Sequence, residues 1–570
     1  MPLSPLSISA AALLLASAAS AAAAASPYPG GRTRGSVYFT APSSFTFAPG
    51  VLDATAAAWG ASTDMLGTAS GFGQLTITTG GAPLADAVQM YAAGFLEASL
   101  TAARISSHYV NVGAWIRSQF KGGAIPQKIV DFFTTQDAWA RANVASNASS
   151  PIWRATGLVT AQLDGLVAGY AAAAAASGGA LPALDVFAFQ QMNAIGDFLD
   201  LIPALSLSED SWDWANMTDA QLMDRVRKTT HCSALVKVNG DLTQLYFSHA
   251  AWFIYTGTTR IFKHYNFKLA DAAVAGTQMS FASYPAYLSS LDDFYSIWSS
   301  GLNMLETTNS VFNMSLYKLV VPQSLFAWQR VRNANLLAHT GPEWGATLAA
   351  YNSGTYNNQY DIVNVGIFAP GKALPDNILT IVEQIPGLVV YGDASQELER
   401  GHFPSYNVPY FREIYDQSGY RQTIDSRRAA GEPLGELSGL DYQLAPRAKI
   451  FRRDNGKAET FDGFLGVMRY NNYKSDPYSS SPWDAICSRG DLAGGPDGCY
   501  DAKAGTAADW PLRRSWAING PTTGDVPPGG SLPPFSWAQY NATSHVGLPE
   551  VYDFAFEAMV PDAEVWPITA

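Results

Sequence analysis

Apolar and polar residues are distributed differently in the first and second parts of the chain. Short β-prone runs at residues 37–39 and 74–79 are followed by longer helix-like segments at 85–105 and 182–199. Strands are expected as short runs bounded by turn residues, whereas helices are longer. We therefore expect the part that ends near residue 205 to contain a few short strands followed by helices.

A polar stretch separates this part from the rest of the chain. Residues 208–214 read Ser-Glu-Asp-Ser-Trp-Asp-Trp, and a polar helix is predicted over 218–228. Exposed polar segments tolerate cleavage because few core contacts depend on them. We interpret residues 206–231 as an exposed connector at the end of an amino-terminal fragment, residues 26–231.

The second part begins with a predicted β-hairpin. The β-prone run 232–238 is followed by Asn239-Gly240, the strongest short signal for a tight hairpin turn, and by a return strand at 242–248. A second hairpin is predicted over residues 293–308. The second part is thus predicted to begin with hairpins, whereas the first part ends in helices.

Residues 232–570 are interpreted as one carboxy-terminal fragment. A Ser-capped helix is predicted over 324–337, and further strands over 360–367 and 387–391. Hairpins interleaved with helices indicate an α+β fold in which helices cover antiparallel sheets. No repeat of fixed period and no long linker interrupts the chain, so we expect one intertwined globular unit.

Composition narrows the choice of partners. Only 15% of the 570 residues are charged and 48% are hydrophobic, which favours a compact chain over a disordered one. The formal net charge is -13, and the sequence contains no clustered basic segment of the kind that binds phosphate backbones. A nucleic-acid partner is therefore not expected.

The amino terminus is typical of a secretory signal peptide. An apolar core at residues 10–18 is followed by small residues, so we predict a signal peptide over residues 1–25. The segment is too short for a secure membrane anchor. An alanine-rich run at 166–176 is interrupted by Gly169 and is predicted to be a helix of the folded protein. No stable membrane span is expected after the signal peptide.

Sequons and cysteines fit the same pathway. N-x-Ser/Thr sequons, which we interpret as glycosylation sites, occur at Asn147, Asn216, Asn313 and Asn541. Cysteines tend to pair in an oxidising compartment, and Cys487 and Cys499 are close enough in sequence to close a small loop. Cys232 then remains as the unpaired cysteine.

Several familiar chemistries lack their motifs. The sequence contains no Gly-x-Ser-x-Gly, no phosphate-binding Gly-x4-Gly-Lys-Ser/Thr and no Gly-x-Gly-x-x-Gly. Its seven histidines form no His-x3-His pair. We therefore expect no serine nucleophile elbow, no bound metal and no cofactor.

Cys232 is the remaining candidate nucleophile. A thiol is mostly protonated near neutral pH and needs a base or a positive field. Cleavage of the His231–Cys232 bond would create an α-amino group, of ordinary pKa near 8, beside the thiol, and this amine could take the thiol proton. The same thiol could cut its own upstream peptide bond by an N-to-S acyl shift. Alternatively, a lone cysteine is simply a small buried hydrophobic residue.

Ordered motifs after this cysteine resemble the phospholipase B-like family. The segments that carry the resemblance are Cys232-Ser-Ala-Leu-Val-Lys, Ser248-His-Ala-Ala-Trp252, Leu305-Glu-Thr-Thr308, Ser405-Tyr-Asn-Val-Pro409 and Arg447-Ala-Lys-Ile-Phe-Arg-Arg-Asp454. The resemblance implies an αββα sandwich of the amino-terminal nucleophile hydrolase type that cleaves itself before Cys232. It further implies a secreted or lysosomal glycoprotein that removes fatty acyl chains from phospholipids.

The motifs also imply roles for individual residues. Cys232 would be the nucleophile and its freed amine the base, while His249 would polarise or orient the site. Asn407 is the candidate oxyanion donor, and Arg447 would supply a fixed positive charge that favours the thiolate. Thr308 is preferred over its neighbour for the hydroxyl that completes the pocket.

Other interpretations of the same residues remain open. Trp252 is either part of the site or core packing. Thr307 is an alternative to Thr308. The protein would be a phospholipid hydrolase, an amidase of the same fold, or a secreted glycoprotein that binds acyl lipids without turnover. In the enzyme interpretation the two self-cleaved fragments stay associated.

Overall fold

The computed structural model describes most of the chain. The described residues are 31–81, 83–207, 213–229, 232–291, 294–429, 431–524 and 532–568. The predicted signal peptide, residues 1–25, lies outside them, and so does His231, on the amino side of the predicted cleavage bond.

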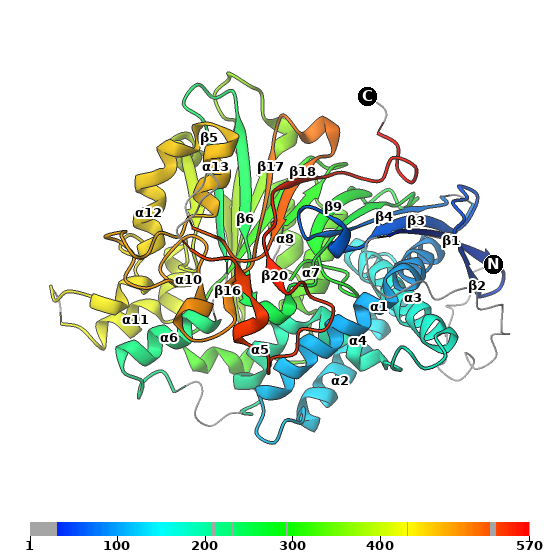
Figure 1. Ribbon diagram of the computed structural model, residues 1–570, viewed down its shortest axis with the longest axis horizontal. Coiled ribbons are helices and arrows are strands. Elements are labelled where there is room, and N and C mark those ends of the chain that lie inside the picture. The colour runs from blue at the N-terminus through cyan, green and yellow to red at the C-terminus, as the bar shows by residue number, and fades with distance from the viewer. Residues whose placement is uncertain are drawn as a thin grey trace.

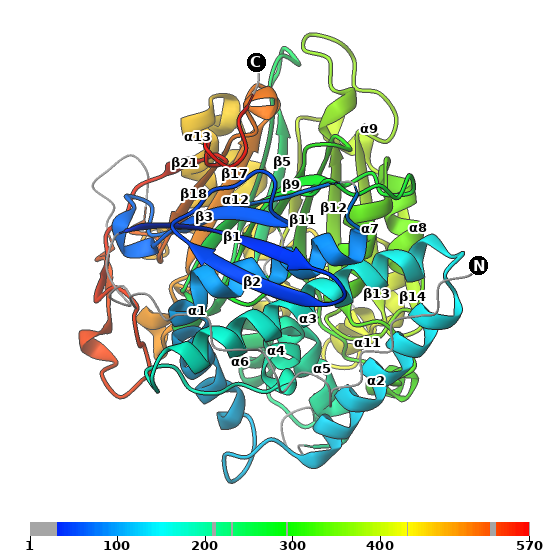
Figure 2. The same cartoon turned by 90° about the vertical axis from the view of Figure 1, so that its right-hand side faces the viewer.

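Eleven strands form the larger of two sheets (Figures 1 and 2). In spatial order they are β14 (Leu388–Asp393), β13 (Leu379–Ile385), β12 (Asn358–Asn364), β11 (Leu302–Thr308), β10 (Phe294–Ile297), β9 (Gln278–Ser283), β8 (Ile261–Asn266), β4 (Gly73–Thr79), β3 (Ala58–Thr63), β1 (Arg32–Thr40) and β2 (Ser44–Pro49). Neighbours are antiparallel except β4 and β8, which pair in parallel. Because β4 precedes the connector and β8 follows Cys232, this pair joins the two parts of the chain in one sheet.

Six strands form the second sheet, all from the part of the chain after Cys232. Their order is β15 (His402–Ser405), β5 (Ser233–Val238), β6 (Leu245–Ala250), β17 (Asp501–Thr506), β18 (Ser515–Asn519) and β21 (Glu557–Met559). Two short pairs complete the strands: β7 (Trp252–Ile254) with β16 (Asp497–Cys499), and β19 (Phe535–Ser536) with β20 (Val551–Tyr552).

Helices lie outside both sheets. Those from the part before the connector are α1 (Asp86–Ser118), α2 (Gln127–Ser146), α3 (Pro151–Ala176), α4 (Val186–Asn193) and α5 (Ile195–Ala204). The connector contributes α6 (Asp219–Thr229). Later helices are α7 (Ala327–Leu337), α8 (Gly341–Ala349), α9 (Ser395–Glu399), α10 (Arg412–Gln417), α11 (Tyr420–Asp425), α12 (Pro446–Asp454) and α13 (Phe461–Met468). The predicted α+β class is confirmed.

Three hydrophobic clusters define the layers. One packs α1, α3 and α7 against the large sheet. A second lies between the two sheets and contains Val236, Phe247 and Leu305. A third, with Leu235 and Phe451, packs α6, α12 and α13 against the other face of the small sheet. Successive residues of a strand point to opposite faces, so β5 sends Val236 toward the large sheet and Leu235 toward the helices.

Helices α1 and α3 pack closely because small residues face each other. A Cβ atom on Gly94 would lie 1.9 Å from the Gln162 carbonyl oxygen, and one on Gly165 would lie 2.0 Å from that of Tyr91. Within the described chain, α3 is the one helix long and apolar enough to cross a membrane by length and composition. It contains the alanine-rich run predicted to be a helix and packs lengthwise against α1.

The first predicted hairpin exists, but its turn differs from the prediction. Strand β6 begins at Leu245 rather than Leu242, so a six-residue loop, 239–244, replaces the two-residue turn. Asp241 accepts hydrogen bonds from the Thr243 N–H and hydroxyl, and Asn239 accepts one from the Gln244 N–H. These side chains satisfy the loop locally, which a tight Asn-Gly turn would not require.

Two helix predictions also need correction. The predicted helix 182–199 is two helices, α4 and α5, that meet at Ala194. The predicted serine cap of α7 is absent, because the helix begins at Ala327. There the Asp197 carboxylate accepts the Ala327 N–H, and the Gln329 side chain accepts the Phe326 N–H. The start of this helix is therefore capped by the distant Asp197 carboxylate and by the Gln329 side chain, rather than by a serine.

The predicted Cys487–Cys499 disulfide is present. Asn216 and Asn541 are exposed, and Asn147 and Asn313 are partly exposed. All four sequons are therefore at the surface.

Candidate active site

Cys232 lies directly before β5 and is fully buried. Its φ angle of 88° falls in the left-handed region, which non-glycine residues rarely adopt. The Arg447 guanidinium helps to hold this turn, because its Nη1 donates to the Cys232 carbonyl at 2.6 Å and to the Ser233 hydroxyl at 3.1 Å. The backbone before β5 is thus fixed at the residue predicted to be the nucleophile.

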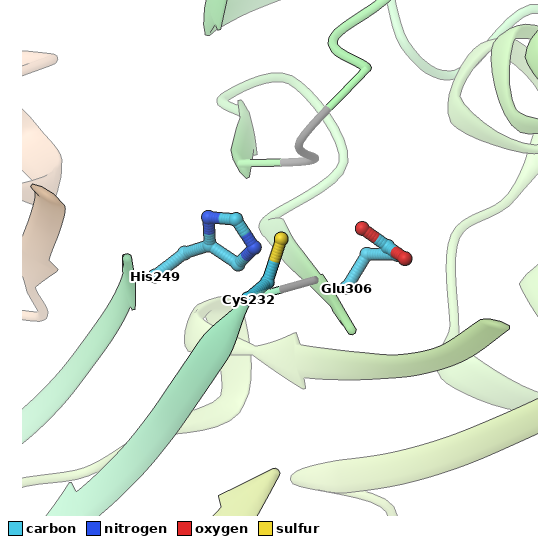
Figure 3. Close-up of side chains that lie close together, drawn as sticks. All are labelled: Cys232, His249 and Glu306. Carbon is cyan, nitrogen blue, oxygen red and sulfur yellow. The ribbon is translucent and has the colours of Figure 1, made fainter. Parts of the chain in front are cut away.

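Three side chains converge at this point (Figure 3). His249, in β6, and Glu306, in β11, flank the Cys232 thiol, and one nitrogen, oxygen or sulfur atom of each lies within 4.8 Å of the others. All three residues are fully buried. His249 is brought here by the β5–β6 register, in which it pairs with Ala234. The two sheets therefore meet at the thiol.

His249 is held as a neutral imidazole. Burial lowers its pKa well below the ordinary value, and the nearby Lys503 ammonium lowers it further. Nζ of Lys503 lies 2.9 Å from Nδ1 of His249, because the two residues are paired across β6 and β17. A ring with a strongly lowered pKa is a weak base near neutral pH.

Arg447 connects the remaining predicted residues. Its Nη2 donates to Oδ1 of Asn407 at 2.6 Å, and its guanidinium stacks 4.4 Å from the Trp252 ring centroid. Burial lowers the pKa of Arg447 to about 10, which leaves it charged at neutral pH. The positive charge therefore lies on the carbonyl side of Cys232, and Trp252 packs against it as part of the site.

Asn407 and Thr308 close the arrangement. Nδ2 of Asn407 donates to the Thr308 carbonyl at 2.6 Å, and the Thr308 hydroxyl donates to Glu306 at 3.1 Å. Thr307 instead shares a hydrogen bond with the Ser405 hydroxyl. The structure thus places Thr308, rather than Thr307, in the same network as Cys232, and it brings together every predicted catalytic residue.

Charged residues that the sequence did not single out lie beside this network. Glu306 was part of a quoted motif, as a carboxylate inside a buried strand, but only its threonine neighbours were considered. Lys503 and Asp501 occupy alternate positions of β17, and a salt bridge of 3.0 Å joins Asp501 to Arg260. The sequence feature that could have indicated Asp501 and Lys503 is a pair of charged residues at alternate positions of a buried strand.

Cysteine, histidine and glutamate are the side chains that bind zinc. A ligating imidazole normally donates its other ring N–H to an acceptor. Here Nδ1 of His249 faces the Lys503 ammonium, which has only protons to donate. The positive charge and the hydrogen-bond direction both oppose a cation between these three residues, so the donor set does not fit a metal.

A pocket adjoins the network at Thr308. Its walls include Leu199, Trp214, Val311 and Tyr356, with Asp200 as a half-buried polar group and Thr229 at the end of α6. Mixed apolar and polar walls of this kind suit an amphipathic organic molecule. The end of the connector helix therefore forms part of the pocket beside the thiol.

Comparison with known proteins identifies the family of the chain. The Phospholipase B family model matches residues 58–559. The chain belongs to the phospholipase B family. It is 44% identical over 521 residues to phospholipase B of Crotalus adamanteus, with 90% of each chain covered. It is 41% identical over 519 residues to phospholipase B-like 1 of Rattus norvegicus, covering 90% of this chain and 89% of the relative.

A human relative is also similar to this chain over nearly its whole length. Phospholipase B-like 1 of Homo sapiens is 39% identical over 550 residues, covering 94% of this chain and 93% of the relative. The chain therefore spans nearly the whole length of these family members. The resemblance found in the motifs after Cys232 extends across both sheets and the helices before the connector.

Proposed function

We propose that this protein is a self-processing hydrolase that removes fatty acyl chains from phospholipids with the Cys232 thiol. The observation that carries the proposal is the buried Cys232 thiol between His249 and Glu306, in a family whose members are named phospholipase B. The layered sheets with helices on their outer faces support an amino-terminal nucleophile hydrolase fold of αββα type.

Maturation would begin with the thiol itself. Sγ attacks the carbonyl carbon of His231, the peptide nitrogen leaves as the amine of Cys232, and the thiol proton goes to that nitrogen. Water then hydrolyses the thioester, which releases the His231 carboxylate and restores the thiol. The fixed backbone at Cys232 supports this step, because Arg447 holds the next carbonyl and limits rotation of the residue.

The new α-amino group is the proposed base for lipid hydrolysis. His249 is poorly suited to that role because its pKa is lowered far below neutrality. A freed amine at Cys232 lies next to its own thiol and needs only a modest pKa decrease to accept a proton near neutral pH. Glu306, whose carboxylate lies within 4.8 Å of the Cys232 sulfur, is the proposed partner of the resulting ammonium.

Lipid hydrolysis would repeat the same chemistry. The thiolate attacks the ester carbonyl, the glycerol oxygen leaves with a proton from the ammonium, and water releases the fatty acid from the thioester. Arg447 and Asn407 supply positive charge and N–H groups on one side of Cys232, which would stabilise the developing oxyanion. The pocket at Thr308 would receive part of the lipid.

The cut chain is expected to remain one particle. β4 and β8 pair across the two fragments, and the buried Lys263–Glu97 salt bridge joins β8 to α1. Helix α1 also belongs to the large hydrophobic cluster that contains residues from both fragments. The disulfide and the surface sequons support passage through the secretory pathway to a secreted or lysosomal location.

A substrate panel tests this function. Purified wild-type protein, Cys232→Ser and Cys232→Ala would be incubated with diacyl phospholipid, lysophospholipid and N-acyl amide, and released fatty acid would be measured. We expect release from phospholipid by wild type and loss of at least about 10³-fold in Cys232→Ala, since the nucleophile is removed. Preferential amide cleavage, or equal release by Cys232→Ala, would contradict the proposal.

A further inference from the structure

His249 is backed by a buried charged pair on the neighbouring strand. Nζ of Lys503 lies 2.9 Å from Nδ1 of His249 and 2.7 Å from Oδ1 of Asp501. All three side chains are completely inaccessible to solvent. The pair lies on the side of the imidazole opposite Nε2, so it can act on Cys232 only through His249.

The partners of Asp501 establish the charge state of this pair. Its carboxylate also accepts the Ala251 N–H at 3.1 Å and forms a salt bridge with Arg260 at 3.0 Å. Lys503 and Arg260 thus both form salt bridges with this carboxylate, and Lys503 takes part in its pair as the ammonium. A charged ammonium has three donors and no acceptor. Nδ1 of His249 must therefore accept from Lys503.

This hydrogen bond decides where the imidazole carries its proton. A neutral ring that accepts at Nδ1 is protonated at Nε2. Nε2 of His249 is buried. The charged groups facing the ring are Lys503, Arg260 and the Glu306 carboxylate, and the Glu306 carbonyl accepts a hydrogen bond from the ring. The ring thus presents an N–H donor toward the site of the thiol.

We infer that Lys503, held by Asp501, is a positioning residue that fixes His249 as the Nε2–H tautomer, a hydrogen-bond donor for the acyl group that reacts with Cys232. The inference deepens the proposed function and rests on it for the identity of the reaction. It makes His249 an electrophilic aid rather than a base.

The competing explanation is a purely structural ion pair. The described chain offers a matched case in Lys263 and Glu97, which are equally buried and 2.7 Å apart but touch none of the residues of the thiol network. The double variant Lys263→Met/Glu97→Gln removes both charges there. It reports what loss of a buried pair does to the fold without a change at His249.

The test measures the histidine directly. [¹⁵N]Histidine-labelled full-length protein would be prepared as Cys232→Ala, with and without Lys503→Met, and His249 would be assigned by its loss in His249→Gln. We expect ¹⁵N shifts of a neutral Nε2–H ring from pH 7.5 to pH 5 when Lys503 is present. In Lys503→Met we expect mixed tautomers and a ring pKa that rises but stays below its ordinary value, because the ammonium is gone while burial, the larger cause of the lowered pKa, remains.

Kinetics with the thiol present complete the test. Lys503→Met should lower kcat for phospholipid hydrolysis about 10- to 100-fold, the range seen when an orienting partner is lost, with KM changed less than twofold. On acidification its activity should begin to fall at a higher pH than that of wild type, because loss of the ammonium raises the pKa of His249. The Lys263→Met/Glu97→Gln control should keep the wild-type tautomer and pH profile. If Lys503→Met does not fold, Asp501→Asn should shift the tautomer in the same direction to a smaller extent.

Two results would overturn the inference. One is an Nδ1–H ring in the presence of Lys503, and the other is a Lys503→Met variant whose tautomer and pH profile match the control. The tautomer measurement needs no turnover, so it stands even if the protein hydrolyses no lipid. Conversely, an active enzyme with an unaltered ring in Lys503→Met would retain the proposed function and reject the positioning role.

Discussion

Lys263 and Lys503 are both completely buried and both bind a completely buried carboxylate at 2.7 Å, yet their remaining contacts differ. Lys263 also donates to the Tyr287 carbonyl, an ordinary backbone acceptor. Lys503 instead donates to Nδ1 of His249, a residue that lies beside the Cys232 thiol.

The comparison separates two uses of the same buried pair. A buried ion pair contributes little net stability, because desolvation offsets the attraction, but removal of one partner is costly. The first pair, Lys263 with Glu97, ties β8 to α1 across the proposed cut. The second pair, Lys503 with Asp501, sits within one strand and faces a titratable ring. Burial and charge alone therefore do not mark a functional residue, whereas the chemistry of the last acceptor does.

The largest effect is expected from breaking the first pair. Lys263→Met should lower the free energy of unfolding by about 3–5 kcal/mol, since Glu97 is left buried without its cation. Urea unfolding followed by tryptophan fluorescence measures this loss. The double variant with Glu97→Gln should recover most of it. A single variant as stable as wild type would mean that Glu97 simply becomes protonated.

The next effect concerns His249, the ring to which Lys503 of the second pair donates. His249→Ala should lower kcat/KM about 10²- to 10³-fold, the range for removal of one oxyanion donor. His249→Gln should retain at least about a tenth of wild-type activity, because its amide places an N–H near the position of Nε2. Steady-state hydrolysis of phospholipid measures both. Equal loss in the two variants would show that His249 acts as a base and not as a donor.

The effect that is smallest for each pH unit involves a buried carboxyl group that, unlike Asp501, has no ion pair in the described chain. Burial raises the pKa of Asp361 well above its ordinary value, and Glu383 raises it further. The folded protein therefore keeps a proton that the unfolded chain releases above pH 4. The associated stability is complete below pH 4 and falls as pH rises toward the folded-state pKa.

Asp361→Asn removes this dependence. The stability of the variant relative to wild type should increase with pH above 4, by about 1.4 kcal/mol for each pH unit until the folded-state pKa is reached. Thermal unfolding of both proteins between pH 4 and pH 7.5 measures the difference. A constant difference across that range would show that Asp361 is ionised in the fold.

Local patterns predicted the elements better than their ends. The strand predicted over 232–238 is present as β5 (Ser233–Val238), and the helix predicted over 218–228 is present as α6 (Asp219–Thr229). The loop at 239–244 was not predicted, because its length depends on the side-chain hydrogen bonds of Asn239 and Asp241. The start of α7 depends on Asp197, which is 130 residues away in sequence.

The candidate site divides in the same way. Cys232, His249 and Arg447 were found through ordered motifs, and the structure places them together. Lys503 and Asp501 were not found, because the β6–β17 register that sets Lys503 against His249 joins residues 254 positions apart. No local pattern encodes that register. Residues that only long-range strand pairing brings to the site therefore could not be predicted from the sequence.

The central claim is that Cys232 becomes the first residue of a second chain by its own chemistry. Intact mass and peptide mass spectrometry of purified wild type and Cys232→Ala test it most directly. The account predicts a carboxy-terminal fragment with a free amine on Cys232 in wild type, and an uncut chain in Cys232→Ala. An intact His231–Cys232 peptide in lipid-hydrolysing wild-type protein, or cleavage of the alanine variant at the same bond, would contradict it.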